Sequence, residues 1–205
     1  EHAAHAAHRH RLELVEAPEV ILMTDKPTVA LRGKPQSSMV VGLRLQTEGR
    51  SDAFVSAGNT GAQMAASVFV LRLHEGLTRP AIGTLFPTAR KPVVVLDSGA
   101  NVDEGRDIPV GQCDRGEIDV VVCDGFVGNV LLKFYEALAP TLMGMFAKAL
   151  GAEREALEQA FRELDYADHG GAPLLGVKGV SIISHGKSGP RAIKNAIRVA
   201  VKAAE

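Results

Sequence analysis

Short apolar runs, separated by polar turns that often contain glycine, recur along most of the chain. The runs Val93-Val94-Val95-Leu96 and Val120-Val121-Val122 are continuously apolar, which is typical of strands covered on both faces. Other runs have the length and the flanking turn residues of short strands. We expect strands at residues 12–16, 20–23, 53–56, 81–85, 92–96, 119–123 and 180–183.

Between these runs, apolar residues recur at helical spacing, which predicts helices at about 38–47, 59–74 and 127–150 and at the C-terminal end. The first of these helices begins after Ser37 and Ser38 and ends at Gly49. Its inner face should carry Met39, Val40, Leu43 and Thr47. Pro140 should kink or break the third helix, because proline lacks a backbone N–H. Strands that alternate with helices predict an α/β fold with a parallel or mixed sheet between helices.

The composition fits one soluble α/β domain or two small ones, since 46% of the 205 residues are hydrophobic and the formal net charge is -1. No apolar run reaches the ~18 residues of a membrane-spanning helix. The near balance of 23 basic and 24 acidic residues argues against nucleic acid as the main partner. Cys113 and Cys123 lack CxxC spacing, so neither a disulfide framework nor a zinc site is indicated, and a reducing cytoplasm is expected.

The amino-terminal segment begins at Glu1 without a secretory signal, so we expect a fragment that lacks its original amino terminus. His2, His5 and His8 lie three residues apart and could in principle hold a metal ion. This spacing drifts around a helix, and no carboxylate or cysteine joins the set. A solvated, alanine-rich helix is the favoured interpretation, and no metal or cofactor is expected.

Four polar loops that contain glycine each follow a predicted strand. The first, Gly58-Asn59-Thr60-Gly61, opens a helix whose first backbone N–H groups lack acceptors and favour a bound anion such as phosphate. An ordinary turn capped by Asn59 or Thr60 would have the same pattern. The other loops span residues 97–103, 123–129 and 184–190. Because ligands of open α/β folds bind at the carboxyl ends of strands, four such loops favour a shared cleft.

The same segments, in the same order, resemble the phosphate acyltransferase family of bacterial phospholipid synthesis. The resemblance rests on Asp52-Ala-Phe-Val-Ser-Ala-Gly-Asn-Thr-Gly-Ala62, Lys26-Pro27 with Ser37-Ser38-Met39, 97–103, 119–130 and Ser184-His-Gly-Lys-Ser188. It implies transfer of a long acyl group from acyl carrier protein to inorganic phosphate, which gives acyl phosphate. It also implies a three-layer α/β/α fold like that of isocitrate and isopropylmalate dehydrogenases. A cytoplasmic homodimer at the membrane is implied, with a downstream acylglycerol-phosphate acyltransferase as a candidate partner.

The chain departs from the family pattern at two places. The family's opening strand and its Asp-Ala-Met-Gly-Gly-Asp loop would precede Glu1, and a long insert would separate Asp103 from Glu104. Truncation of the natural protein is one explanation. We favour the other, that these segments are missing only from the chain as it stands, because deleting strands exposes unpaired backbone groups. Residues 1–205 are then a single acyltransferase domain that is incomplete.

Attack of phosphate on a thioester needs a phosphate cradle, a donor for the oxyanion and an exit for the thiol. Asn59, Thr60 and Gly61 are the expected cradle, with backbone N–H groups of Gly125 and Gly128 or of residues 186–188 as further donors. Asn101 and Asn129 are candidate catalytic ligands of the carbonyl or the phosphate. The expected substrate-binding set is Ser56, Asn59, Thr60, Gly61, Asp97, Gly99, Asp103, Asp124, Gly125, Gly128, Gly186, Lys187 and Ser188.

His185 is expected to protonate the leaving thiolate or to lie beside phosphate as a cation, because histidine titrates near neutral pH. A structural or capping role is the alternative. Lys187 either neutralises phosphate or is a solvated loop residue. Carboxylates repel phosphate, so Asp97, Asp103 and Asp124 are expected to orient neighbouring side chains or to cap helices.

Two helices carry candidate contact surfaces. The helix at 127–150 has a wide apolar face, and we expect the subregion 127–165 to form a dimer interface with a membrane-contacting tip at 142–146. Burial in the core is the alternative for these residues, and 153–165 should be an acidic, solvated helix. The final helix carries four basic residues that suit acyl carrier protein or anionic lipid, or form a solvated face. These are Arg191, Lys194, Arg198 and Lys202.

Other functions stay open on these residues. A phosphate acetyltransferase-like enzyme would use acyl-coenzyme A, and a decarboxylating dehydrogenase would share the broad architecture. The lack of a Gly-x-Gly-x-x-Gly motif and of an evident metal-binding carboxylate set weighs against the dehydrogenase. A non-catalytic, membrane-peripheral scaffold is disfavoured by the Asn, Thr and His residues in the loops.

Overall fold

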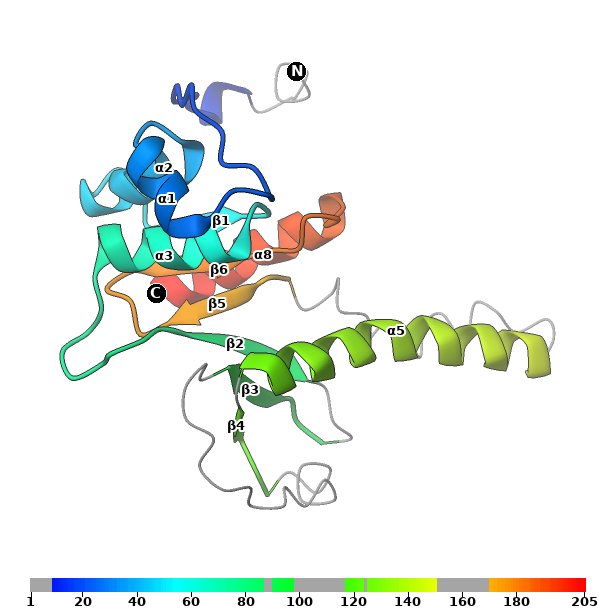
Figure 1. Cartoon of the computed structure of the whole chain (residues 1–205). Helices are drawn as coiled ribbons and strands as arrows, with labels where there is room; N and C mark the ends of the chain where they lie inside the picture. The colour runs from blue at the N-terminus through cyan, green and yellow to red at the C-terminus, as the bar shows by residue number, and fades with distance from the viewer. Residues whose placement is uncertain (1–8, 87–89, 98–116, 124, 151–169) are drawn as a thin grey trace.

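A mixed six-stranded sheet forms the centre of the protein in a computed structural model, which describes residues 9–86, 90–97, 117–123, 125–150 and 170–205 (Figure 1). The strands are β1 (Ala53–Ser56), β2 (Ala81–Phe86), β3 (Val93–Asp97), β4 (Val120–Cys123), β5 (Ala172–Leu175) and β6 (Val180–Ile183). Their order in the sheet is β1-β6-β5-β2-β3-β4. The β1–β6 and β3–β4 pairs are parallel, and the other neighbours are antiparallel.

Helices cover both faces of the sheet at β1 and β6. The described helices are the 3₁₀ turn η2 (Arg9–Arg11), α1 (Pro27–Gly33), α2 (Ser38–Thr47), α3 (Thr60–Leu71), α5 (Gly125–Leu150) and α8 (Pro190–Ala204). In Figure 1, α2 and α3 lie on one side of β6 and α8 lies on the other. The three-layer α/β/α class expected from the sequence is therefore confirmed.

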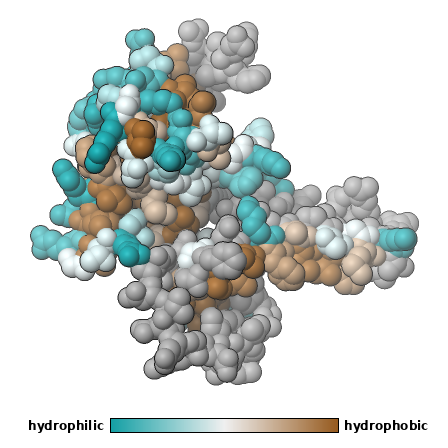
Figure 2. All heavy atoms as spheres, in the orientation of Figure 1, coloured by the Kyte–Doolittle hydropathy of each residue, from teal (hydrophilic) through white to brown (hydrophobic). Residues whose placement is uncertain are grey.

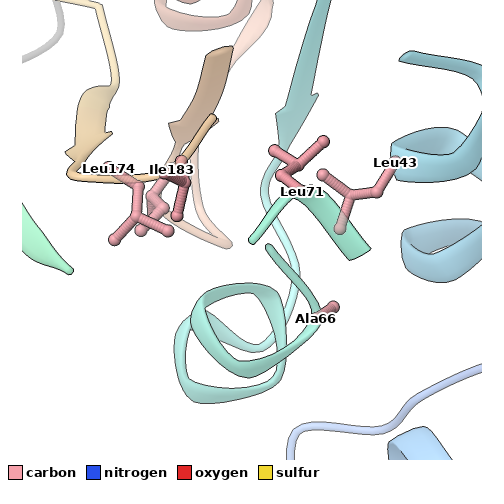
Figure 3. Packing of buried hydrophobic residues seen from close by; sticks show 6 residues of the cluster. Leu43, Ala66, Leu71, Leu174 and Ile183 are labelled. Carbon is pink, nitrogen blue, oxygen red and sulfur yellow. The ribbon is translucent and has the colours of Figure 1, made fainter. Parts of the chain in front are cut away.

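Neighbouring residues of β6 belong to two different hydrophobic clusters. Ile183 packs with Leu43 of α2 and Ala66 of α3, in the cluster shown in Figure 3. Ile182 packs on the opposite face with Ala196 and Ala200 of α8. Successive strand residues point to opposite faces of a sheet, so β6 contributes to both layers of the core. This arrangement fixes α3 and α8 relative to the carboxyl end of β6.

Most of the predicted elements are present with similar bounds. Strands β1 and β6 match the expected ranges, β2 and β4 differ from them by one residue at one end, and β3 is shifted by one residue at both ends. Helix α2 buries Met39, Val40 and Leu43 as expected. Thr47 is exposed, which corrects the sequence prediction, because its hydroxyl donates to the Arg44 carbonyl oxygen in the last turn.

The strands expected at 12–16 and 20–23 do not form. Within 9–25, only Glu19 forms a bridge, with Ser37, and most apolar side chains of this segment are exposed, Leu14 to 84%, while Ile21 is half-buried. A strand needs a paired neighbour along its length, and the apolar spacing alone could not show that none is available here. The sequence reasoning also missed α1 and β5.

Two expectations about burial and helix continuity were wrong. Val120 and Val122 of β4 are exposed to 49% and 60%, so this apolar run is not covered on both faces. Among the described strands, β4 lies at the end of the order, beside β3 alone. Helix α5 is not broken at Pro140 but runs from Gly125 to Leu150. A proline removes one hydrogen bond from a helix, and the remaining bonds of a helix this long maintain its continuity.

Candidate functional site

Two of the four polar loops lie side by side because β1 and β6 are parallel neighbours. Their last residues, Ser56 and Ile183, are paired, so 57–59 and 184–189 leave the same end of the sheet. The backbone N–H of Ser184 donates to the Ser56 carbonyl oxygen at 2.8 Å. A Cβ atom on Gly186 would lie 3.6 Å from the Ala57 carbonyl oxygen, so the loops are in contact. These loops bring the Asn59 and His185 segments together as the sequence predicted.

Asn59 is the N-cap of α3 and is buried, with 8% of its surface exposed. Its Oδ1 accepts the backbone N–H of Ala62 at 3.0 Å. Its Nδ2 lies 3.2, 3.3 and 3.4 Å from the carbonyl oxygens of Leu22, Met23 and Asp25. The amide side chain therefore joins the helix start to segment 22–25, and its polar atoms are already used within the protein.

The first turn of α3 still offers backbone donors. Asn59 satisfies the N–H groups of Ala62 and Gln63, through its side chain and its carbonyl oxygen. The N–H groups of Thr60 and Gly61 have no acceptor among the residues that the structure describes. Thr60 is exposed, so a ligand can reach this turn from solvent. Such a helix start suits an anion with several oxygens, because its dipole and its N–H groups act together.

Glycines let neighbouring segments approach this turn closely. A Cβ atom on Gly58 would lie 2.5 Å from Cε of Met39, and one on Gly61 would lie 3.0 Å from Cγ of Pro27. Ser56 also takes part, since its Oγ accepts the Gly58 N–H at 3.2 Å. The loop therefore has a fixed backbone conformation against α1 and α2. A fixed backbone holds N–H donors in place without a cost of ordering them when a ligand binds.

Segment 22–25 is anchored from its other side by Asp25. Its Oδ2 accepts the Lys34 ammonium at 2.5 Å and the Leu22 N–H at 2.9 Å. The hydrogen bond from Lys34, and then that from the Leu22 backbone, hold the pKa of the Asp25 carboxyl below its ordinary value. Lys34 also donates to the Val20 carbonyl oxygen at 2.8 Å. The carbonyl groups that contact Asn59 are thus held in place by an ion pair.

This linkage predicts a specific dependence of stability on pH. Because the folded-state pKa of Asp25 is lowered, its stabilising effect is present near neutral pH and is lost as the carboxyl protonates, below about pH 4. Asp25→Asn should therefore lower Tm slightly at pH 7, and the difference from wild type should shrink as pH falls through that range. Thermal unfolding followed by circular dichroism measures this. Asp52→Asn, at an exposed aspartate, is the matched control, and an equal shift at every pH would contradict the linkage.

The His185 loop forms a tight turn on the neighbouring strand. Nδ1 of His185 accepts the backbone N–H of Lys187 at 3.1 Å, and the His185 carbonyl oxygen accepts the N–H of Ser188 at 2.9 Å. When Nδ1 is an acceptor, the neutral ring carries its proton on Nε2. The side chains of His185 and Lys187 are exposed, and Ser188 is half-buried. The loop therefore presents an imidazole N–H donor and an ammonium group to solvent beside the α3 turn.

A buried polar contact that the sequence reasoning missed connects α3 to β6. Gln63 is fully buried, and its Nε2 donates to the Ser181 Oγ at 3.1 Å and to the Ile182 carbonyl oxygen at 2.9 Å. Ser67 Oγ bonds to Ser181 Oγ at 3.0 Å. The available signal was two polar residues four apart on a helix that is otherwise apolar on its inner side. These bonds fix the α3 turn relative to the strand that leads into the His185 loop.

The other two loops do not start at the same end of the sheet. β2 is antiparallel to both β5 and β3, so β3 and β4 run opposite to β1 and β6. Asp97 ends β3 beside Cys123 of β4, and α5 follows with Gly125, Gly128 and Asn129 in its first turns. The expectation that all four loops leave one edge of the sheet is therefore wrong. Gly99, Asn101, Asp103 and Asp124 lie outside the described residues, as do His2, His5, His8, Cys113 and 153–165.

Comparison with known proteins assigns the chain to a family. The model of the fatty acid synthesis protein family matches residues 2–111 and 104–205, which together include both loops of the α3 and His185 site. The chain belongs to this family.

Curated relatives of this chain share the name phosphate acyltransferase. That of Desulforamulus reducens is 40% identical over 95% of this chain and 78% of its own length. Those of Moorella thermoacetica and Heliobacterium modesticaldum are 37% and 39% identical, over 94% and 96% of this chain and 76% and 79% of their own lengths. The family is one of acyltransferases.

The matched regions of this family member and its relatives differ in length. The alignment to the Desulforamulus reducens protein runs over 265 residues, whereas this chain has 205. Relatives therefore carry residues that have no counterpart here. The family model matches in two stretches that meet at residues 104–111, outside the described part of the chain. The location of the extra residues between Asp103 and Glu104 stays a prediction.

No described helix has the length and hydropathy needed to cross a bilayer.

Proposed function

We propose that the protein transfers a long-chain fatty acyl group from acyl carrier protein to inorganic phosphate, giving acyl phosphate. The observation that carries this proposal is the exposed α3 turn with its two unused N–H groups, beside a loop that holds a histidine and a lysine. A site of this kind binds a small oxyanion and needs no resident cofactor. Membership in an acyltransferase family supplies the acyl chemistry.

In the proposed reaction a phosphate oxygen attacks the thioester carbonyl carbon. The new C–O bond forms as the C–S bond breaks, and the carrier-protein thiolate leaves with a proton. The N–H groups of Thr60 and Gly61 hold the phosphate, and Lys187 offsets its charge. In its imidazolium form His185 supplies the Nε2 proton to the thiolate and becomes a neutral ring; Nδ1 also carries a proton in that form, so it does not accept the Lys187 N–H during this step. The backbone N–H of Gly186 stabilises the oxyanion that develops on the carbonyl, since those of Lys187 and Ser188 donate to His185 in the structure.

Asn59 takes a different place in this scheme from that expected in the sequence. Its amide is committed to Ala62 and to segment 22–25, so we assign it as a positioning residue that aims the Thr60 and Gly61 donors. Gly125, Gly128, Asn129 and Asp97 remain proposed ligands of a second subsite at the opposite end of the sheet. Gly99, Asn101, Asp103 and Asp124 remain proposed ligands whose place is not assigned.

The direct test follows release of free thiol from a long-chain acyl carrier protein as inorganic phosphate is varied. Saturable, phosphate-dependent release, with acyl phosphate as the product, is the expected result. Equal activity with acyl-coenzyme A would identify a phosphate acetyltransferase-like donor preference instead. No release with either donor would favour the scaffold interpretation. Arsenate, which also has tetrahedral oxygens, should compete with phosphate, whereas chloride should not.

Helix α5 supports a contact role for the subregion 127–165. Its apolar side chains are exposed, including Phe134 to 62% and Met145 to 63%, and Figure 2 shows hydrophobic atoms along this projecting helix. We propose a homodimer interface on this face, with membrane contact at 142–146. Flotation with anionic phospholipid vesicles tests the membrane contact, and loss of binding in a Leu142→Gln, Phe146→Gln variant would support it.

Helix α8 supports an acidic partner. Arg191, Lys194, Arg198 and Lys202 are all exposed along it. We propose that they attract acyl carrier protein by long-range electrostatics. The initial rate should then fall with ionic strength, and a rate that does not depend on salt would contradict this role.

A further inference from the structure

An apolar pocket lies between α8 and the sheet, on the side of β5 that faces away from β6. Its volume is about 240 Å³. Almost every lining side chain is apolar, and Thr84 supplies the one side-chain hydroxyl. The lining residues are Gly83, Thr84, Leu85, Val94, Gly170, Gly171, Ala172, Pro173, Leu175 and Val199.

One end of the pocket lies next to the segment that begins the His185 loop. Gly171, which lines it, adjoins Ala172, and Ala172 is paired with Ile183. A Cβ atom on Gly171 would lie 2.9 Å from the Ser184 Oγ, and Ser184 begins the His185 loop. Neighbouring strands are about 4.8 Å apart, so the pocket begins one strand away from the proposed acid.

Glycine keeps the wall between pocket and site thin. A Cβ atom on Gly171 would also lie 2.6 Å from Cγ2 of Ile182, and one on Gly170 would lie 2.5 Å from the backbone carbonyl carbon of Asn195. Gly170 has a φ of +74°, a backbone conformation that residues with a Cβ atom rarely adopt. These contacts let 170–171 pass between β6 and α8. A bulkier segment there would separate the pocket from the loop.

We infer that this pocket binds the hydrocarbon chain of the acyl substrate near its carbonyl end. The inference rests on the proposed function, because an acyl group that reacts beside His185 must place its chain in the nearest space. A chain of methylene groups fits a lining without charged side chains, since each buried methylene is stabilised by leaving water and needs no hydrogen-bond partner. A phosphate or a nucleotide would find no cationic side chain among the described lining residues, and Thr84 as their one side-chain hydroxyl.

Photolabelling tests where the acyl chain binds, and this test does not depend on catalysis. A palmitic acid with a diazirine on a carbon near its carboxyl end is bound to the whole protein and irradiated, and the adducts are located by mass spectrometry. Adducts at residues 83–85, 170–175 or 199 support the pocket. Adducts confined to α5, or to the exposed face of α8, would overturn the inference.

A pair of α8 variants then tests whether the pocket accommodates the reacting chain. Val199→Phe fills the pocket, whereas Val201→Phe places the same ring two residues away at a position that is 56% exposed. Val199→Phe should raise KM for a sixteen-carbon acyl donor about tenfold, the effect of excluding one or two methylenes, and leave KM for an acetyl donor, the short donor that has no chain to enter the pocket, nearly unchanged. Val201→Phe should change neither.

The outcomes separate this inference from the proposed function. If thiol release depends on phosphate but Val199→Phe affects long and short donors equally, the pocket is not the acyl site and the proposed function stands. If the protein shows no phosphate-dependent release, yet Val199→Phe removes the photolabel and Val201→Phe does not, the pocket binds acyl chains and the proposed reaction is wrong.

Discussion

Replacement of Asn59 with alanine is expected to lower the free energy of unfolding by about 2 kcal/mol, since it removes an N-cap and the Nδ2 donor that contacts the carbonyl groups of segment 22–25. The side chain is 8% exposed and contacts Ala62 and segment 22–25. At temperatures where the variant stays folded, KM for phosphate should rise, because the Thr60 and Gly61 donors lose their fixed orientation. Urea unfolding and phosphate-dependent thiol release measure the two effects.

Asn59→Asp separates the cap from the contact with segment 22–25. Aspartate keeps the oxygen that accepts the Ala62 N–H but replaces the Nδ2 donor with an acceptor that faces three carbonyl groups. We expect α3 to start at the same residue while segment 22–25 moves away, which hydrogen exchange of residues 22–25 would detect. If Asn59→Ala is as stable as wild type, or if its KM for phosphate is unchanged, Asn59 does not position the site.

The sequence was sufficient for the elements that carry this site. β1 and β6 are short apolar runs bounded by polar turns, and the turn after each contains glycine. These signals depend only on residues close in sequence, so the packing of distant segments does not change the elements that they predict. The helix start after Asn59 is likewise local, because an asparagine N-cap acts within one turn.

Strand direction could not be obtained in the same way. The shared cleft required β3 and β4 to run parallel to β1 and β6, but three successive antiparallel pairings, β6–β5, β5–β2 and β2–β3, leave β3 and β4 in the opposite direction. Direction depends on pairing between distant segments, for which apolar spacing carries no signal. α1 was missed for a related reason, since Ala30 is its one buried residue and a short helix with one inward side chain has no periodicity.

The role of Asn59 shows the same limit at the level of one side chain. The residue type correctly indicated a helix cap, whereas a role as an anion ligand stays a prediction. Which carbonyl groups its Nδ2 contacts depends on segment 22–25, more than thirty residues away in sequence. Residues 20–23, which overlap that segment, were expected to be a strand, and a strand would have used its carbonyl groups in a ladder. The contacts of Nδ2 could therefore not be predicted.

Replacement of Gln63 with glutamate is expected to destabilise the protein by about 3 kcal/mol or more at pH 7, because it places an unpaired charge where no surface is exposed. The new carboxylate oxygen would face the Ile182 carbonyl oxygen in place of the Nε2 donor. Burial raises the pKa of a carboxyl group. The folded variant should therefore hold its proton to a higher pH than the unfolded chain, and its stability should increase as pH falls towards about 4.

Gln63→Leu is the matched control, since it loses the same donor without adding a charge. It should be destabilised less than Gln63→Glu at pH 7, and its difference from wild type should not depend on pH. Both variants should also weaken phosphate-dependent activity, because the bonds from Gln63 hold the α3 turn against the strand that leads to His185. Equal Tm values for wild type and Gln63→Glu across pH 4 to 8 would mean that Gln63 is not buried as the structure has it. Full activity in a folded Gln63→Leu variant would show that the α3 turn keeps its position without this contact.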